Sequence, residues 1–166
     1  MAAVRDLVER STVPTVVDGD GLFALAAAGA PIARCAEVLV TPHDGEFALL
    51  AGAPPGSDRL AAARGLAARL GVTVLLKGPV TVVASPDGTV LVVDEGDERL
   101  ATAGSGDVLA GVAAALLAQG LDPCAAGAAA AWLHGRAGRR VPPHGMIASD
   151  LVGALPAVWA DMTGEG

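Results

Sequence analysis

The chain has 166 residues, of which 52% are hydrophobic and 17% are charged. This length and composition predict a single domain over residues 1–166, and they exclude a wholly disordered chain or a miniprotein held together by disulfides. Eleven basic and eighteen acidic residues give a net charge of −7, so we expect no broad basic surface for nucleic acid or anionic lipid, and any phosphate site has to be local.

Short apolar runs rich in valine alternate along the chain with alanine-rich segments of helical periodicity. This alternation predicts an α/β fold in which helices flank a mostly parallel central sheet. The predicted strands are residues 14–18, 38–41, 72–77, 81–85 and 89–93, the last two forming an antiparallel hairpin around Pro86-Asp87-Gly88. The predicted helices are residues 4–10, 21–28, 45–51, 58–70, 107–119, 123–139 and 149–162. The expected helix caps are Ser57, Asp122 and Ser149.

The cysteines and the apolar segments favour a cytoplasmic protein. Cys35 and Cys124 lie far apart and form no C-x-x-C pair, which argues against a metal clip or a dithiol redox motif. No uncharged apolar run reaches the roughly 20 residues that a membrane-spanning helix needs. The first ten residues have no apolar region of the kind found in secretory signals. We therefore expect neither a membrane nor a nucleic acid as a partner.

The first predicted strand suits the interior of a sheet. Thr15, Val16 and Val17 show no alternation of polar and apolar residues, as expected for a strand flanked by neighbours on both sides. Only one short amphipathic helix precedes this strand. We therefore expect the chain to begin partway through a larger domain, with N-terminal strands missing and an unpaired sheet edge that could associate with another chain.

The strongest local motif is Ala101-Thr102-Ala103-Gly104-Ser105-Gly106-Asp107, directly before an apolar helical run. Glycines let the backbone approach a ligand closely, and the free N–H groups at the start of a helix favour an anion of phosphate size. Asp107 lies in the first turn, where its carboxylate could take a proton from a hydroxyl group. The alternative is that these residues only start a helix.

The segment Thr41-Pro42-His43-Asp44-Gly45-Glu46 follows a predicted strand, at the sheet edge where α/β proteins bind ligands. There, His43 could hydrogen bond to a ligand, and Glu46 could hold a hydrated Mg²⁺. The alternative is that Asp44 or Glu46 only caps the next helix.

The segment Lys77-Gly78-Pro79-Val80-Thr81 contains the only lysine of the chain, at the end of a predicted strand. Its ammonium group could neutralise a nucleotide phosphate, with Thr81 or backbone N–H groups adding hydrogen bonds. Alternatively, the lysine extends into water.

Four other polar residues are candidates of lower priority. Asp18 could line the same cleft, while Asp20 is expected to cap the helix that follows. His134 is expected on a helix face, packed near Trp132, and His144 in a loop.

Six segments of the chain, taken in order, resemble the ribokinase-like ADP- or ATP-dependent NAD(P)H-hydrate dehydratases. They are VVDGDGLFAL, TPHDGEFALLAG, LLKGPVTVVASPDG, LATAGSGDVLAGVAAALLAQGLDP, AWLHGRAG and ASDL. The resemblance covers nearly all of this chain but only the C-terminal part of that family's domain. It implies a ribokinase-like layered fold and a reaction that returns hydrated NADH or NADPH (NAD(P)HX) to its reduced form, driven by ADP or ATP with Mg²⁺.

The same resemblance implies roles for particular residues. His43 and Asp107 would contact the substrate, with Asp107 as the catalytic base. The nucleotide would be bound by Lys77, Gly78, Pro79, Val80, Thr81, Gly104, Ser105 and Gly106. Asp107 would remove the proton from the hydrate's hydroxyl group, so that the oxygen attacks a phosphoryl group and phosphate becomes the leaving group.

The chain departs from the family pattern in three ways. Asp44 stands where a proline is usual, Gly19 and Gly21 replace alanines, and the upstream glycine-rich segment is absent. Two other functions stay open: a small-molecule hydroxyl kinase of the same superfold, and a non-catalytic nucleotide-binding fragment. Association with a second copy or with an N-terminal part is also expected to be possible.

Overall fold

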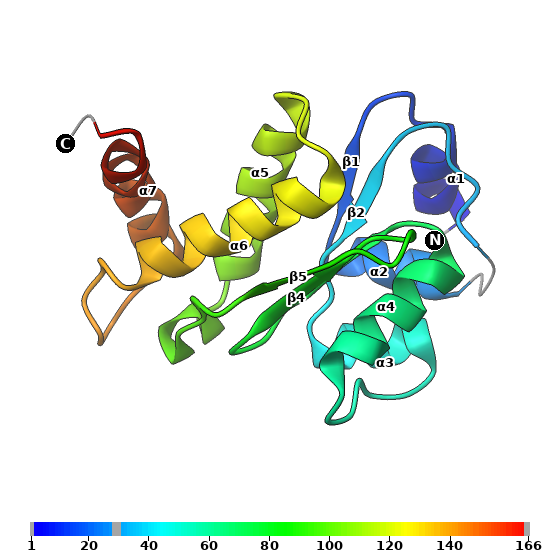
Figure 1. Cartoon of the computed structure of the whole chain (residues 1–166), viewed down its shortest axis with the longest axis horizontal. Coiled ribbons are helices and arrows are strands. Elements are labelled where there is room, and N and C mark those ends of the chain that lie inside the picture. Colours follow the sequence, from blue (N-terminus) through cyan, green and yellow to red (C-terminus); the bar gives the residue numbers. More distant parts are fainter. Residues whose placement is uncertain (1, 28–30, 165–166) are drawn as a thin grey trace.

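All predicted strands and helices are present, with shifted boundaries. The structure, a computed structural model, describes residues 2–27 and 31–164 (Figure 1). The strands are β1 (Thr15–Val17), β2 (Val38–Val40), β3 (Thr73–Leu76), β4 (Thr81–Ala84) and β5 (Val90–Val93). The helices are α1 (Ala2–Arg10), α2 (Asp20–Ala26), α3 (Asp44–Ala51), α4 (Arg59–Leu70), α5 (Ser105–Ala118), α6 (Pro123–Gly138) and α7 (Ala148–Thr163), with a 3₁₀ turn η1 (Glu98–Ala101). Ala28, the last residue of the predicted helix 21–28, lies outside the described residues.

The five strands form one sheet in the order β1-β2-β3-β4-β5. The pairs β1–β2 and β2–β3 are parallel, whereas β3–β4 and β4–β5 are antiparallel. Strand β5 therefore runs in the same direction as β1, β2 and β3, and only β4 runs against them. The predicted mostly parallel sheet and the predicted hairpin are both confirmed. The carboxyl ends of β1, β2, β3 and β5 consequently meet at one edge of the sheet.

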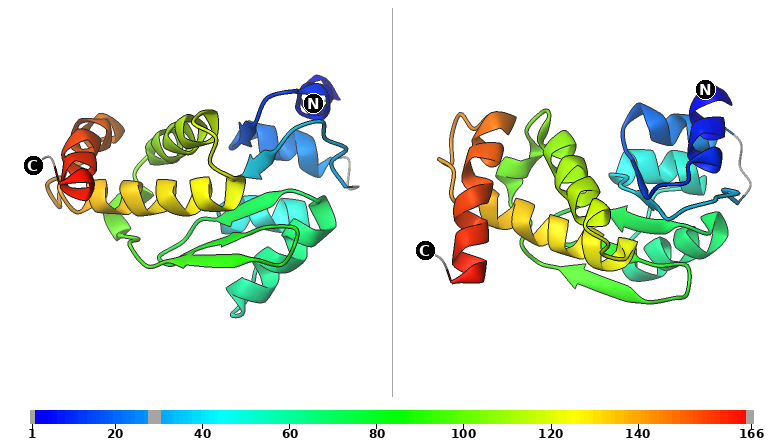
Figure 2. Two further views of the ribbon diagram at one scale, coloured as in Figure 1. Left: turned by 45° about the horizontal axis from the view of Figure 1, so that its top comes forward. Right: turned by 90° about the horizontal axis from the view of Figure 1, so that it is seen from above.

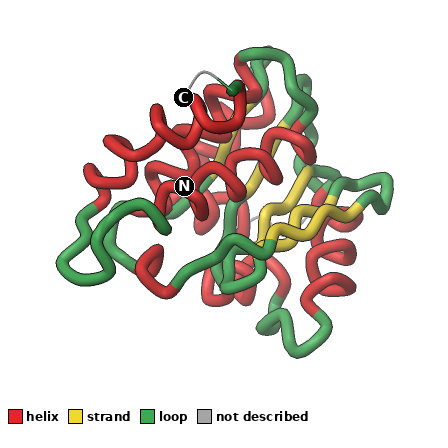
Figure 3. Tube along the Cα trace, turned by 60° about the vertical axis from the view of Figure 1, so that its left-hand side comes forward, coloured by secondary structure: helices red, strands yellow, loops and turns green. Residues whose placement is uncertain are grey.

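Helices cover both faces of the sheet. Figure 2 shows this arrangement from two further directions, and in Figure 3 the strands lie between helices. In β3, Val74 and Leu76 belong to the core shared with α1 to α4, whereas Leu75 belongs to the core shared with α5 to α7. Because successive side chains of a strand point to opposite faces, a strand buried on both sides needs an uninterrupted apolar run. This requirement explains the valine-rich runs in the sequence.

Several predicted caps are wrong, because neighbouring residues take the cap position. Asp58, rather than Ser57, accepts the Ala61 N–H at 2.9 Å at the start of α4. At the start of α7, the Asp150 carboxylate accepts the Ile147 N–H at 3.0 Å, and Ser149 already lies inside the helix. Asp122 caps α6 as predicted.

Two helices begin after a glycine whose backbone has a positive φ. Gly19, with φ of 52°, precedes α2, so Asp20 is the first helical residue and not the expected cap. Gly104, with φ of 84°, precedes α5, which therefore begins at Ser105, two residues earlier than predicted. Residues with side chains rarely adopt this backbone conformation, and glycine adopts it freely. Within the described ranges, no helix is long and apolar enough to cross a membrane.

Candidate active site

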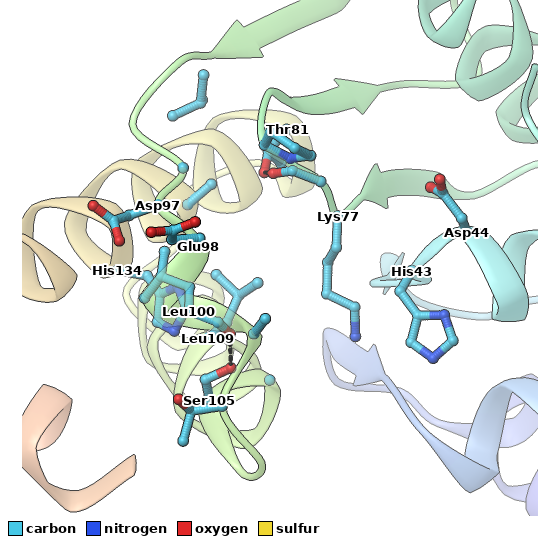
Figure 4. A pocket seen from close by; sticks show the side chains of 18 of the residues that line it. His43, Asp44, Lys77, Thr81, Asp97, Glu98, Leu100, Ser105, Leu109 and His134 are labelled. Atoms are coloured by element: carbon cyan, nitrogen blue, oxygen red, sulfur yellow. Dashed lines mark hydrogen bonds between the residues drawn. The ribbon is translucent and has the colours of Figure 1, made fainter. Parts of the chain in front are cut away.

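A cavity of about 760 Å³ lies at the sheet edge where the carboxyl ends of the strands meet. Its walls are the segments that follow β2, β3 and β5, together with the first turns of α5 and the middle of α6. The close-up view shows Lys77 and His43 on one side of this space and His134, Leu100 and Leu109 on the other (Figure 4). Binding sites of open α/β sheets are expected at this edge, and the volume suits a ligand of nucleotide size.

Lys77 is held between two carboxylates. Its Nζ donates a hydrogen bond to Oδ1 of Asp18 at 2.9 Å and lies 3.5 Å from Oε2 of Glu46. The lysine side chain is 21% exposed. The structure therefore does not place Lys77 in open solvent. Asp18, directly after β1, pairs with Lys77 but is not part of the cavity wall.

The N-terminus of α5 faces this charged group. A Cβ atom added at Gly106 would lie 3.4 Å from Oδ2 of Asp18 and 3.6 Å from Nζ of Lys77. The first N–H groups of a helix have no partner within it, and they lie at the positive end of the helix dipole. The tip of α5 and the Lys77 ammonium thus lie side by side, with the Asp18 carboxylate next to both. Ser105 is buried, with its hydroxyl donating to the carbonyl oxygen of Leu100.

The other predicted residues of the lysine segment 77–81 and of the first turn of α5 differ in whether they line the cavity. Gly78, Pro79 and Thr81 line the cavity, whereas Val80 is exposed and does not. Asp107 lies in the first turn of α5 as predicted, is exposed, and is not part of the cavity wall.

His43 and Glu46 form a reciprocal cap at the start of α3. The Nδ1 of His43 accepts the N–H groups of Gly45 at 3.0 Å and of Glu46 at 3.2 Å, and Oε2 of Glu46 accepts the N–H of His43 at 2.8 Å. The capping alternative is thus correct for Glu46, but His43 takes the position expected for Asp44. Because Nδ1 is an acceptor, the neutral ring carries its proton on Nε2. This Nε2 lies 3.6 Å from Oε1 of Glu46, and the His43 side chain, 60% exposed, lines the cavity.

The residues around Glu46 fit a protein-bound Mg²⁺ poorly. Its carboxylate is 9% exposed and already has the His43 N–H and the Lys77 ammonium as neighbours. Within residues 2–27 and 31–164, no group of three or more His, Cys, Asp or Glu side chains is placed to hold a metal ion. Magnesium usually keeps several waters and binds through one or two carboxylates plus substrate phosphates.

Arg59, which the sequence analysis missed, joins the two loops that carry His43 and Lys77. Its guanidinium donates to the carbonyl oxygen of Lys77 at 2.8 Å and to Oδ1 of Asp44 at 2.7 Å. Asp44 is the residue that departs from the family's usual proline, so an ion pair here contributes to fixing this loop. The only local signal for Arg59 is its place next to the helix cap Asp58, which does not indicate a distant contact.

The loop after β5 forms another wall that was not predicted. Oδ1 of Asp97 accepts from Nε of Arg99 at 2.7 Å and Oδ2 accepts from its NH2 at 2.7 Å, giving a two-point ion pair. The hydrogen bonds from Arg99 lower the pKa of Asp97 to about 2. Gly96 packs against the lysine loop, because a Cβ atom there would lie only 2.0 Å from the carbonyl oxygen of Pro79.

Substituting Gly96 by alanine is expected to push the two loops apart. The clash is with backbone, which gives way less easily than a flexible side chain, so we expect a loss of roughly 1 to 3 kcal/mol in the free energy of unfolding. Denaturant unfolding measures this loss. Gly65→Ala is the matched control, because no atom lies within 4 Å of its added Cβ on α4. The control is expected to be neutral or stabilising by up to about 1 kcal/mol, and equal effects of both changes would contradict the proposed contact.

His134 is buried and lines the cavity. The expectation that it only packs near Trp132 on a helix face is therefore incomplete. The residue is 6% exposed, and its Nε2 is buried with no hydrogen-bonding partner among the described residues. Trp132 instead has the guanidinium of Arg136 over its ring, 5.5 Å from the centroid. Burial lowers the pKa of His134 from its ordinary 6.5, and the charge of Lys77 lowers it further, while the backbone of Ser105 opposes both.

This lowered pKa predicts that folding weakens in mild acid. Below pH 6.5, the unfolded chain binds a proton at residue 134 that the folded chain resists, so stability falls as the pH drops toward the folded pKa, by at most about 1.4 kcal/mol per pH unit. Denaturant unfolding at pH 5.5 and 7.5 measures the difference. His134→Leu is expected to reduce it, while His144→Leu, in an exposed loop, is expected to leave it unchanged. The same pH dependence in all three proteins would refute the prediction.

Comparison with known proteins identifies the family of this chain. Residues 1–156 match the family described as NAD(P)H-hydrate dehydratase. The chain belongs to the NAD(P)H-hydrate dehydratase family. The "ADP-dependent (S)-NAD(P)H-hydrate dehydratase" of Neisseria meningitidis is 44% identical over 152 residues, which cover 88% of this chain and 51% of that protein. The "Bifunctional NAD(P)H-hydrate repair enzyme Nnr" of Salinibacter ruber is 44% identical over 170 residues, covering 98% of this chain and 31% of the relative.

A solved member of the dehydratase family has the same fold. It is the ADP/ATP-dependent NAD(P)H-hydrate dehydratase from Bacillus subtilis, co-crystallised with ATP and Mg²⁺ and soaked with CoA. The match has a TM-score of 0.84 with 32% identity, and it covers 94% of this chain and 59% of the Bacillus chain. The expected ribokinase-like α/β fold is thereby confirmed. The chain spans about a third to a half of the length of the two curated relatives.

Proposed function

We propose that this site dehydrates NAD(P)HX to NAD(P)H at the expense of ADP or ATP. The observation that carries the proposal is the placement of three predicted groups around one cavity. The tip of α5 at Gly106 faces Lys77, and Glu46 links Lys77 to the loop of His43. An anionic phosphoryl group and a hydroxyl-bearing substrate can therefore be held side by side, as the activity of the named relatives requires.

The reaction follows from these positions. Asp107 takes the proton of the hydrate's hydroxyl group, and the oxygen forms a bond to the terminal phosphoryl group as the nucleotide leaves with one phosphate fewer. The carbon–oxygen bond then breaks toward phosphate, which is a far better leaving group than hydroxide, with the ring nitrogen supplying its electron pair. Loss of a ring proton to water restores the double bond. The exposure of Asp107 at the helix tip leaves its carboxylate accessible to a substrate as large as a dinucleotide.

The roles of the remaining predicted residues belong to the same proposal. Lys77 and the N–H groups of the segment from Gly104 to Gly106 stabilise the transferring charge. Pro79 and Thr81 contact the nucleotide, and His43 donates from Nε2 to the substrate. The carboxylate of Glu46 is already paired and takes no part in binding magnesium. Magnesium is expected to arrive with the nucleotide phosphates.

An absorbance assay tests the reaction. Incubating the chain with ADP or ATP, Mg²⁺ and NAD(P)HX is expected to produce the absorbance of reduced nicotinamide in step with release of phosphate. If a stable phosphorylated alcohol accumulates and no inorganic phosphate is released, the chain is a hydroxyl kinase instead. Calorimetric binding of ADP without turnover would indicate the nucleotide-binding fragment.

We also propose a cytoplasmic location and association with a second copy or with an N-terminal part. Cys35 and Cys124 are both free, as is usual in a reducing compartment. Strand β1 has a single neighbour, β2, in the described sheet, and an unpaired edge is a template for another strand. Sedimentation of the purified chain over a range of concentrations tests the association.

A further inference from the structure

The starting point is a buried polar atom with no partner. His134 lies on α6 with 6% of its surface exposed, and its Nε2 forms no hydrogen bond within the described residues. Buried polar atoms are nearly always hydrogen bonded, and an exception at the wall of a cavity needs an explanation. The reaction proposed above gives this residue no role.

The surroundings of His134 differ from those of Lys77. Leu109, Ala131 and Val93 are buried residues of the cavity wall, and Leu100 of η1 also lines it. In Figure 4, the ring of His134 lies beside Leu100 and Leu109, away from the ammonium of Lys77. The cavity thus has the Lys77 ammonium at one end and, at the other, aliphatic side chains around the unpartnered Nε2 of His134, with the carboxylates of Asp97 and Glu98 also in the wall there.

This division matches the two ends of a nucleotide. Phosphates bound at the tip of α5 beside Lys77 leave the flat, apolar base to occupy the other end, where aliphatic side chains can cover its faces. The lowered pKa of His134 keeps the ring neutral near pH 7, with one nitrogen as donor and the other as acceptor. The edge of a purine offers both a donor and acceptors.

We propose that His134 contacts the nucleotide and hydrogen bonds to its purine base. The inference rests on the proposed function, because it assumes that the phosphates occupy the end near Lys77. In this proposal α6 recognises the purine base, whereas the phosphates are bound by α5 and by the loop of Lys77.

Calorimetry with two ligands tests this assignment. ADP carries phosphates and base, whereas inorganic pyrophosphate carries the phosphates alone. His134→Leu is expected to weaken ADP binding roughly tenfold, the cost of leaving one buried hydrogen bond unmade, and to change pyrophosphate binding less than twofold. His134→Asn, which keeps a donor and an acceptor, is expected to recover part of the ADP affinity. His144→Leu is the matched control and is expected to bind both ligands as the unchanged chain does.

The outcomes separate the inference from the function on which it rests. Thermal unfolding of each variant first shows that it is folded. If the unchanged chain binds neither ADP nor pyrophosphate, the proposed phosphate site is wrong. If it binds both and His134→Leu lowers the two affinities equally, or lowers neither, the base contact is wrong while the phosphate site stands. A raised KM for NAD(P)HX with unchanged ADP affinity would assign His134 to the substrate and overturn the proposal.

Discussion

Asp107→Asn is expected to reduce turnover by roughly 10²- to 10⁴-fold, the contribution of a general base to a proton transfer. The amide cannot take the hydroxyl proton, but it leaves the backbone of the first turn of α5 in place. ADP affinity is therefore expected to stay within a few-fold of that of the unchanged chain. Initial rates of reduced nicotinamide formation and calorimetric ADP titrations measure the two effects.

A matched variant distinguishes the loss of a catalytic base from the mere loss of one carboxylate in the first turn of a helix. Asp20 is likewise an exposed carboxylate in a first turn, that of α2, and the proposed reaction gives it no role. Asp20→Asn should therefore have full turnover. An Asp107→Asn protein that retains full turnover would remove Asp107 from the mechanism, and a tenfold or greater loss of ADP affinity would make it a binding residue.

Lys77→Ala is expected to weaken nucleotide binding by roughly 1 to 3 kcal/mol, the range of a charge-assisted hydrogen bond. It is also expected to lower the free energy of unfolding by up to about 3 kcal/mol, because Asp18 and Glu46 lose the cation between them. The two carboxylates would then repel each other in a space that water enters only partly. Calorimetry with ADP and denaturant unfolding report the two losses independently.

The control for this substitution is Arg64→Ala, which removes an exposed cation from α4. Any effect of net charge alone should occur in both proteins, whereas a local effect should occur only at Lys77. Unchanged ADP affinity in Lys77→Ala would exclude Lys77 from the nucleotide site. Unchanged stability would show that its ion pairs contribute nothing measurable, as is common for exposed pairs.

The fold could be predicted because its signals are local and repeated. Leu39, Leu75 and Val83 each lie between residues that face the opposite core, so a strand buried on both sides reads as a continuous apolar run. The helix boundaries were less accurate. The backbone conformation of Gly104, which lets α5 begin at Ser105, depends on contacts outside the motif, including a close approach to Ala148.

The site was predicted only where its residues follow strands. Lys77 comes directly after β3 and His43 three residues after the end of β2, so their meeting at one edge follows from the parallel arrangement. Arg59 and His134 lie within helices. Arg59 reaches the loops of His43 and Lys77, and His134 reaches the cavity wall, through the packing of those helices, which no local pattern encodes. Asp97 belongs to a short loop whose position depends on the approach of Gly96 to Pro79.

The chain carries a single lysine, and the structure places it beside the tip of α5. A reagent that acylates primary amines therefore has one side-chain target in the whole protein, apart from the terminal amine. Ligand protection of that target can be read as a mass difference on one peptide, without any engineered label. The unusual composition thus supplies an internal chemical reporter of whether the pocket is filled.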